Sequence, residues 1–419
     1  MALRGVRLIA GVFVAGALVV AAACGDDLAS SSADAGADAL TFDGERAEPD
    51  ADRAEPDGAP SDAGADASDA TLDASEAATP PPSLVYVATG PGNVFVFAAD
   101  GSGALVPQPG SPAATGGVKA RGLLGNAAGT RLYTGIFTND GNAGVTSFVL
   151  DAGGDIASLQ AGSPFATNVR AMPTRMAVNP AGTRLYVAHQ GVTPSIAVFA
   201  LDAAGNIGAL RSGSPFGTGT GTASASVNHA GTRLYVTSQE ARAVFVFGLD
   251  ANGDITGLRP GSPFGTGVAD SIPLRSVVHT KDRRLYVTDQ RADVIVYALD
   301  ANGDITGQTA YSPLPGPNLS YAITMNAAGT RLYVGDLSNK RIEVYTLDKD
   351  SGDVVGSPTS FGVDAGPFDC ALDVAQSSLF LIDTNNALLS HVFLNDAGDP
   401  ESFVTSVFDG GTPLGIFAR

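Results

Sequence analysis

The chain has 419 residues, and its 24 basic and 43 acidic side chains give a formal net charge of −19. Such an acidic chain lacks the basic surface that a phosphate backbone requires, so we expect no nucleic-acid partner. With 52 Gly, 25 Pro and no Trp, the composition also excludes a long-helix or coiled-coil protein.

The first 23 residues have the layout of a bacterial export signal. Arg4 and Arg7 precede an apolar run over residues 8–20, and small residues then lead into Cys24. The run is shorter than the roughly 20 residues that a membrane-spanning helix needs. Small residues before a Cys resemble the lipobox of bacterial lipoproteins, although Ala21 stands where that motif usually carries Leu. We expect lipidation of Cys24 and attachment to a membrane of the cell envelope, facing the periplasm or the cell surface; an ordinary secretory signal is the alternative.

Residues 24–83 form an Ala- and Asp-rich segment with few large apolar side chains. From residue 25 onward it holds sixteen acidic and two basic residues, and Arg-Ala-Glu-Pro-Asp occurs in it twice. Such a composition cannot bury enough apolar surface to offset the entropy of ordering the chain. We expect a disordered, self-repelling tether between the membrane and a folded domain.

From residue 84 to residue 419 the chain repeats one unit seven times. Gly-Thr-Arg-Leu-Tyr occurs four times, and three degenerate copies complete the series. The aromatic residue of the copies recurs at intervals of 47 to 53 residues, as Tyr86, Tyr133, Tyr186, Tyr235, Tyr286, Tyr333 and Phe380. Each unit has four short apolar runs separated by Gly, Pro, Asn and Asp turns. Repeats of this kind predict an all-β fold, a seven-bladed β-propeller with four strands per blade.

The ends of the repeat region predict how the ring closes. The first unit begins at its second strand, over residues 85–87, and lacks a first strand. Residues 413–417, Pro-Leu-Gly-Ile-Phe, match the missing strand in type. We therefore expect the C-terminal strand to complete the first blade and to remove an exposed sheet edge.

The units resemble the seven-bladed lactonase family, typified by the propeller-type 6-phosphogluconolactonases, and the related YVTN-repeat proteins. The Leu-Tyr-Val strand, the Asn-Pro-Ala-Gly turn at residues 179–182 and the Gly-Ser-Pro-Phe linkers carry the likeness. The resemblance implies hydrolysis of a lactone ring. First strands of the family usually begin Pro-Arg-His, and here Gly122 follows Arg121 where the His would stand.

Strand direction predicts which residues meet at the central channel. Loops between blades share a face with the loops between second and third strands, so first-strand starts and second-strand ends meet at one rim. These positions hold three arginines, four aspartates and one histidine: Arg121, Arg175, Arg275, Asp289, Asp336, Asp369, Asp383 and His189.

This set of side chains fits a small anionic or sugar-like ligand held by arginine, with carboxylates or histidine for acid–base work. We take Arg175, Arg275 and His189 as the candidate catalytic residues, and Arg121 with the four aspartates as the candidate ligand-binding rim. Arginine–aspartate pairs that only neutralise each other are the alternative.

No motif indicates a cofactor or a metal. Residues 250–254 and 300–304 echo the first half of a calcium loop, but an Ile stands where such a loop requires Gly. No His or Cys pair has metal-ligand spacing, and Cys370 is expected to be a small buried residue. We therefore expect neither a metal nor a cofactor.

Two classes of function remain open. The main hypothesis is a monomeric, membrane-tethered propeller that binds a small ligand or an envelope protein at its rim, because the family histidine is missing and phosphorylated sugar lactones are cytoplasmic. The alternative is a lactone-ring hydrolase with an arginine-lined site.

Overall fold

The structure is a computed structural model that describes residues 82–191, 195–218, 221–291, 294–314 and 319–419. The predicted signal peptide, Cys24 and the acidic tether lie outside these residues. None of the described residues belongs to a helix that is long and apolar enough to span a membrane.

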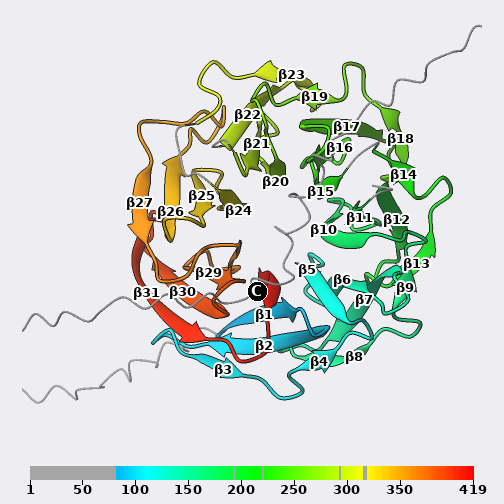
Figure 1. Ribbon diagram of the computed structural model, residues 1–419, viewed down its shortest axis with the longest axis vertical. Coiled ribbons are helices and arrows are strands. Elements are labelled where there is room, and N and C mark those ends of the chain that lie inside the picture. Colours follow the sequence, from blue (N-terminus) through cyan, green and yellow to red (C-terminus); the bar gives the residue numbers. More distant parts are fainter. Residues whose placement is uncertain (1–81, 192–194, 219–220, 292–293, 315–318) are drawn as a thin grey trace, which may run out of the picture. The chain divides into compact units, whose positions relative to one another are not determined.

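Seven antiparallel sheets stand as blades around a central axis (Figure 1). The predicted all-β fold, with seven blades of four main strands each, is confirmed. In blades 1 to 4 a further two-residue strand pairs with the third strand.

Blades 2 to 4 follow the chain from the inner strand to the outer one, whereas the inner strand of blade 1 is the last strand of the chain. Blade 1 comprises β32 (Pro413–Ala418), β1 (Ser83–Thr89), β2 (Asn93–Ala99), β3 (Leu105–Pro107) and β4 (Ala113–Ala114). Blade 2 comprises β5 (Lys119–Gly125), β6 (Arg131–Phe137), β7 (Ala143–Leu150), β8 (Ile156–Leu159) and β9 (Phe165–Ala166). Blade 3 comprises β10 (Met172–Val178), β11 (Arg184–Gln190), β12 (Ser195–Leu201), β13 (Ile207–Leu210) and β14 (Phe216–Gly217). Blade 4 comprises β15 (Thr222–Val227), β16 (Arg233–Ser238), β17 (Ala243–Leu249), β18 (Ile255–Leu258) and β19 (Phe264–Gly265).

Blades 5 to 7 have four strands each. Blade 5 comprises β20 (Pro273–Val278), β21 (Arg284–Asp289), β22 (Val294–Leu299) and β23 (Ile305–Gln308). Blade 6 comprises β24 (Ser320–Met325), β25 (Arg331–Asp336), β26 (Arg341–Thr346) and β27 (Thr359–Gly362). Blade 7 comprises β28 (Asp369–Leu372), β29 (Ser378–Asp383), β30 (Leu388–Leu394) and β31 (Pro400–Val407).

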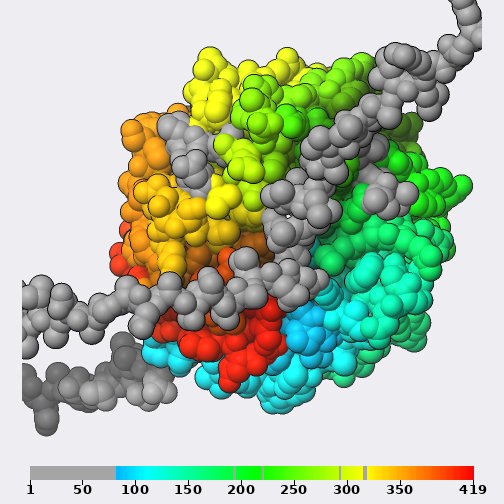
Figure 2. Space-filling model, in the orientation of Figure 1, coloured from blue at the N-terminus to red at the C-terminus, as the bar shows by residue number. Residues whose placement is uncertain are grey.

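The ring closes as the sequence predicts. β32 pairs antiparallel with β1 in a register that sets Val85 opposite Ala418 and Val87 opposite Ile416. Two backbone hydrogen bonds between Leu84 and Arg419, at 3.0 and 2.9 Å, extend this pairing. In the space-filling view the red C-terminal residues lie directly against the blue residues of blade 1 (Figure 2).

Each second strand is buried on both faces because a blade packs between two others. Leu185, Tyr186 and Val187 of β11 have no exposed surface. Leu185 and Val187 pack with Tyr133 and Val145 of blade 2, while Tyr186 packs on the blade 4 side. This two-sided burial explains why the repeat reads Leu-Tyr-Val rather than as an alternation of apolar and polar residues.

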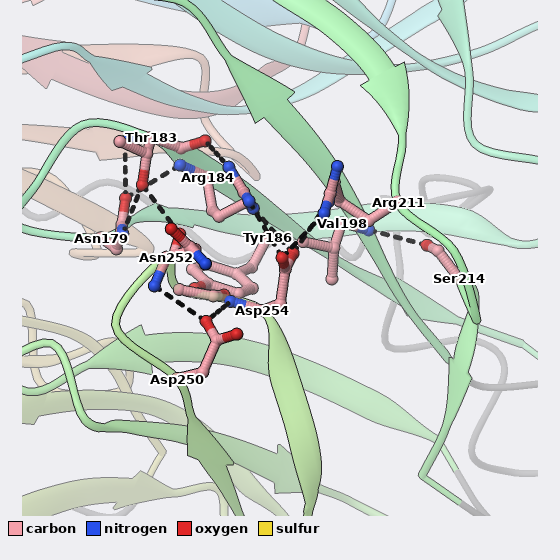
Figure 3. Close-up of polar contacts among 11 residues, drawn as sticks. Asn179, Thr183, Arg184, Tyr186, Val198, Arg211, Ser214, Asp250, Asn252 and Asp254 are labelled. Atoms are coloured by element: carbon pink, nitrogen blue, oxygen red, sulfur yellow. Dashed lines mark hydrogen bonds and ion pairs between the residues drawn. The ribbon is translucent and has the colours of Figure 1, made fainter.

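The polar part of the repeat first builds the turn between the first two strands of a blade. In blade 3 the Oδ1 atom of Asn179 accepts the backbone N–H groups of Thr183 at 2.8 Å and of Arg184 at 2.9 Å (Figure 3). The Nδ2 atom of Asn179 donates to the Thr183 hydroxyl at 3.0 Å. These bonds fix the turn from which the side chains of Arg184 and Tyr186 reach the neighbouring blade.

The same repeat then joins each blade to the following one. The Tyr186 hydroxyl donates to the carbonyl of Gly253 at 2.5 Å (Figure 3). The Arg184 guanidinium donates two hydrogen bonds to the Asp254 carboxylate, at 2.8 and 2.9 Å (Figure 3). Gly253 has φ +84°, and a Cβ there would lie 2.5 Å from Asn179 Nδ2. The hairpin needs glycine at this point because the neighbouring blade approaches so closely.

This tyrosine–glycine bond occurs at six of the seven blade junctions. It joins Tyr86 to Gly154, Tyr133 to Gly205, Tyr186 to Gly253, Tyr235 to Gly303, Tyr286 to Gly352 and Tyr333 to Gly398. At the junction of blades 7 and 1 the corresponding residue is Phe380, which has no hydroxyl to donate. Six junctions therefore share one hydrogen bond, and the seventh is held differently.

Deletion of residues 412–419 should lower the thermal midpoint by at least about 10 °C, because it removes a whole ladder and the buried Ile416 and Ala418. Circular dichroism melting curves of the full and shortened chains would measure this. Deletion of residues 25–76 is the control and should leave the midpoint within about 2 °C. A C-terminal deletion that melts like the full chain would contradict closure by β32.

Substitution Tyr186→Phe should lower the free energy of unfolding by about 1–3 kcal/mol, because the buried Gly253 carbonyl loses its partner. Urea denaturation would measure the change. Thr306→Val removes a hydroxyl whose exposed bond stays within its own blade, and it should change stability by less than about 0.5 kcal/mol. Equal effects of the two substitutions would refute a special role for the bond between blades.

Candidate active site in the central channel

Three inner strands carry an arginine at an irregularity in their pairing. The register shifts between Arg121 and Leu123 in β5, between Pro173 and Met176 in β10, and between Pro273 and Ser276 in β20. Shifts of this kind re-aim side chains beside functional sites. Arg175 and Arg275 stand at corresponding points of blades 3 and 5, and Arg121 stands one residue earlier in blade 2.

Gly122 stands where the family pattern has histidine, and the backbone there explains the glycine. Its φ is +66°, and a Cβ would lie 2.7 Å from the carbonyl oxygen of Thr174 in the next inner strand. A histidine could not take this position without moving β5 away from β10.

Arg175 and Arg275 meet on a single carboxylate. Both guanidinium groups donate to Oδ1 of Asp369. Arg175 belongs to blade 3, Arg275 to blade 5 and Asp369 to blade 7. No two of these blades are adjacent, so the contacts run across the central channel.

The Asp369 side chain is 1% exposed, whereas those of Arg175 and Arg275 are 22% and 11% exposed. Asp369 Oδ1 also accepts the Cys370 N–H at 2.8 Å, and Oδ2 accepts the Ile416 N–H at 3.3 Å. The carboxylate is thus fixed by the backbone and holds the two more accessible guanidinium groups in place.

The channel carries an excess of positive charge. Burial, followed by the charge of Arg175, lowers the pKa of Arg275 to about 10, and Arg121 adds to this effect. Arg275 remains protonated at neutral pH. The Nη1 atom of Arg121 lies 3.2 Å from the sulfur of Met172. One carboxylate among three arginines leaves room for an anion to bind.

An aromatic pair lies beside the arginines and was missed in the sequence. The rings of Tyr321 and Phe368 stack with centroids 5.2 Å apart, and Cζ of Arg275 lies 5.4 Å from the Phe368 ring centroid. Phe368 immediately precedes Asp369, which the repeat alignment places at the start of a first strand, and Tyr321 precedes the corresponding position in blade 6. An alignment shifted by one residue at the bulge would have found them.

Cys370 lies next to Asp369 but has no chemical role in this arrangement. Its side chain is buried, as expected, and is a free thiol. Burial, with the charge of Asp369, raises the pKa of the thiol to about 12. Cys370 therefore stays protonated and packs against its neighbours.

The structure does not bring His189 to the arginines. Its side chain is fully buried, Nδ1 lies 3.2 Å from the carbonyl of Ser195 and Nε2 lies 3.0 Å from the Thr167 hydroxyl. Burial lowers its pKa to about 4. Both ring nitrogens are occupied by structural partners, so we do not include His189 in the candidate site.

Asp289, Asp336 and Asp383 also have local partners. Asp289 accepts the backbone N–H groups of Ile272 and Arg291 at 3.1 and 2.8 Å. Asp336 binds the backbone and the side-chain amide of Asn339, and Asp383 binds Asn386 in the same way. These carboxylates hold the loops that follow the second strands, and Asp369 is the predicted rim aspartate that contacts the arginines.

The turns that echo calcium loops use their aspartates internally. The Oδ1 atom of Asp250 accepts the N–H groups of Asn252 and Asp254 at 2.9 and 2.8 Å (Figure 3). Among the residues that the structure describes, no group of three or more His, Cys, Asp or Glu side chains is arranged to hold a metal ion.

The comparison with known protein families agrees with the fold. A family model described as "Lactonase, 7-bladed beta-propeller" matches residues 77–269. Residues 77–269 are therefore similar to the seven-bladed lactonase family. The resemblance inferred from the repeats is thereby confirmed, and among the two hypotheses the family favours the hydrolase over the binding module.

Solved structures with the same fold have low sequence identity. A proposed 6-phosphogluconolactonase from Bacteroides uniformis ATCC 8492 is 17% identical with a TM-score of 0.66, and 81% of this chain covers 100% of that one. The periplasmic gluconolactonase PpgL from Pseudomonas aeruginosa is 19% identical with a TM-score of 0.61, and 80% of this chain covers 98% of that one. A comparison with curated proteins gives no match.

The buried His189 predicts a dependence of stability on pH. Its pKa is about 4 in the folded chain and about 6.5 when unfolded, so the unfolded state binds the proton first as the pH falls. Between pH 7 and pH 4 this residue should remove on the order of 3 kcal/mol of stability. His189→Gln should flatten the curve of unfolding free energy against pH in this range.

The control for this experiment is His229→Gln, since the His229 side chain is 53% exposed. Chemical denaturation at several pH values would provide both curves. If His189→Gln keeps the full slope of the unchanged protein, the histidine is not buried in its neutral form.

Proposed function

We propose that the protein is a lactone-ring hydrolase whose channel site binds a lactone with an anionic or polyhydroxylated body. The meeting of Arg175 and Arg275 on Asp369 across the channel, with Arg121 nearby, carries this proposal. The match of residues 77–269 to the lactonase family model supports the reaction class.

The chemistry follows from the charges. Attack of water on the lactone carbonyl generates an oxyanion, and opening of the ring releases a carboxylate. Guanidinium groups fixed in advance stabilise such developing negative charge better than mobile water does. Asp369 acts as a positioning residue, because it fixes both guanidinium groups while lying almost wholly out of solvent.

The aromatic pair would complete the site. The stacked rings of Tyr321 and Phe368 border Arg275 and are both partly exposed. Such faces commonly line small-molecule sites and pack against apolar faces of a ligand. Tyr321 and Phe368 are therefore suited to hold a ring while the arginines bind its oxygens.

We further propose that this reaction takes place outside the cytoplasm. The signal layout of residues 1–23 and the lipobox-like Cys24 support attachment to an envelope membrane through the acidic segment. A gluconolactonase described as periplasmic has the same fold, which makes an extracytoplasmic sugar lactone a reasonable substrate to test first.

Arg175→Ala and Arg275→Ala should each lower kcat/KM by roughly 10²–10³-fold, because each removes one preorganised cation from the oxyanion. Hydrolysis of glucono-1,5-lactone and of 6-phosphogluconolactone, followed by acid release, would measure the loss. Thermal melting would confirm that the variants fold.

The matched control is Arg211→Ala. Arg211 forms an ion pair with Asp254 between blades 3 and 4, and its side chain is 39% exposed. This variant should keep activity within about twofold, since exposed pairs contribute little. Absence of turnover on both lactones by the unchanged protein, or equal loss in all three variants, would contradict the proposal.

A further inference from the structure

The outer strand of blade 7 differs from the six others. β31 is eight residues long, whereas β3, β8, β13, β18, β23 and β27 have three or four residues each. β31 pairs along its whole length with β30, from Val407 opposite Leu388 to Pro400 opposite Leu394. Figure 1 shows it as a long arrow at the periphery of the ring.

Blades 1 to 5 interrupt their outer edges with a Ser-Pro turn. In each, a serine Oγ, rather than an outer strand, accepts one N–H group of the third strand. These bonds of 2.8–3.2 Å join Val96 to Ser111, Ser147 to Ser163, Val198 to Ser214, Val246 to Ser262 and Val296 to Ser312. A proline without an N–H follows each serine, so these edges offer little for another strand to pair with. In β31 the only proline is Pro400, at its first residue.

The free edge of β31 presents backbone groups in sequence. The Phe408 N–H donates to the Ala387 carbonyl at 2.8 Å, toward β30. Because alternate residues of an antiparallel strand point the same way, the N–H and C=O groups of Phe403, Thr405 and Val407 point away from β30. β31 is the last strand of its sheet, and Val407 is 77% exposed.

An apolar cavity adjoins the end of this strand. It has a volume of about 280 Å³ and lies between blades 7 and 1, with Phe95, Phe97, Leu389 and Phe408 in its lining. The Phe408 ring meets that of Phe95 edge-on at 5.1 Å between centroids. The volume is below the roughly 300–1,000 Å³ of most small-molecule sites, and it suits a single apolar side chain.

The charges around β31 indicate what kind of chain can pair with it. Asp396 and Glu401 are exposed near its start, and Asp409 is exposed just beyond its end. Antiparallel pairing with a second copy would set these acidic ends against each other, which is unfavourable. An extended segment with basic ends is complementary.

From these observations we propose that β31 is a docking edge for an extended peptide of another protein. The peptide adds to blade 7 as a fifth strand, inserts an apolar side chain into the cavity that Phe95 and Phe408 line, and carries basic residues at its ends. Main-chain hydrogen bonds then give affinity and the cavity gives selectivity, as in other cases of strand addition. This surface is independent of the channel site.

The probe is a fluorescein-labelled peptide, Lys-Thr-Val-Thr-Phe-Val-Lys, titrated with the full chain and followed by anisotropy. Thr405→Pro removes an outward N–H without removing a backbone bond to β30, and it should weaken binding at least about tenfold. Thr405→Val, which loses only the hydroxyl contact with Ser390 of β30, should bind like the unchanged protein. Leu258→Pro is the matched control on β18. The Arg259 N–H donates inward to Val246, so the Leu258 N–H also points outward, and this variant should bind like the unchanged protein.

Two altered probes test the same edge without changing the protein. Replacement of Phe by Asp in the peptide should abolish binding through the cavity, and replacement of both Lys by Glu should weaken it. The proposal is overturned if the unaltered peptide does not bind, or if Leu258→Pro loses as much affinity as Thr405→Pro. It is also overturned if the two altered peptides bind as well as the unaltered one. Analytical ultracentrifugation provides a further test. If the unchanged protein sediments as a dimer and Thr405→Pro sediments as a monomer, the edge pairs with a second copy of this chain and the proposal is overturned.

Discussion

The ring depends on one type of hydrogen bond, which a buried tyrosine hydroxyl donates to the carbonyl of a glycine in the next blade. Flat sheets that pack face to face through apolar side chains can slide past one another, whereas a directed bond at the end of each contact fixes their relative position. Six junctions use this bond. The surrounding Asn, Thr and Arg of the repeat fix the turn and add an ion pair across the same boundary, so the strongest sequence signal in the chain is the contact between blades.

The fold could be predicted from the sequence because the repeat is local and its period is nearly constant. The position of each aromatic residue defines a blade, and an incomplete first unit together with an unmatched last strand defines the closure. The seven sheets confirm the blades, and the pairing of β1 with β32 confirms the closure. The constraints that decide it, burial on both faces and the glycine at each hairpin, are visible in residue types alone.

The site was predicted only in part, and the reason is the bulge at the start of each inner strand. Counting from the repeat aromatic places Arg175, Arg275 and Asp369 at one rim, and the structure brings them together. The same counting cannot tell whether a side chain at the end of a second strand faces the channel or its own loop. Asp289, Asp336 and Asp383 bind their loops, and His189 lies within its blade. Tyr321 and Phe368 are one residue away from the counted positions, which hid them.

The closure strand has a consequence for how the chain reaches its native state. Val85 and Ala418 are paired although more than 300 residues separate them, so the first blade stays incomplete until residues 413–418 have been synthesised. Contacts of such long range slow the final step of folding. Until then the edge of β1 that faces the channel has no partner strand, and the chain becomes a closed ring only after its last strand arrives.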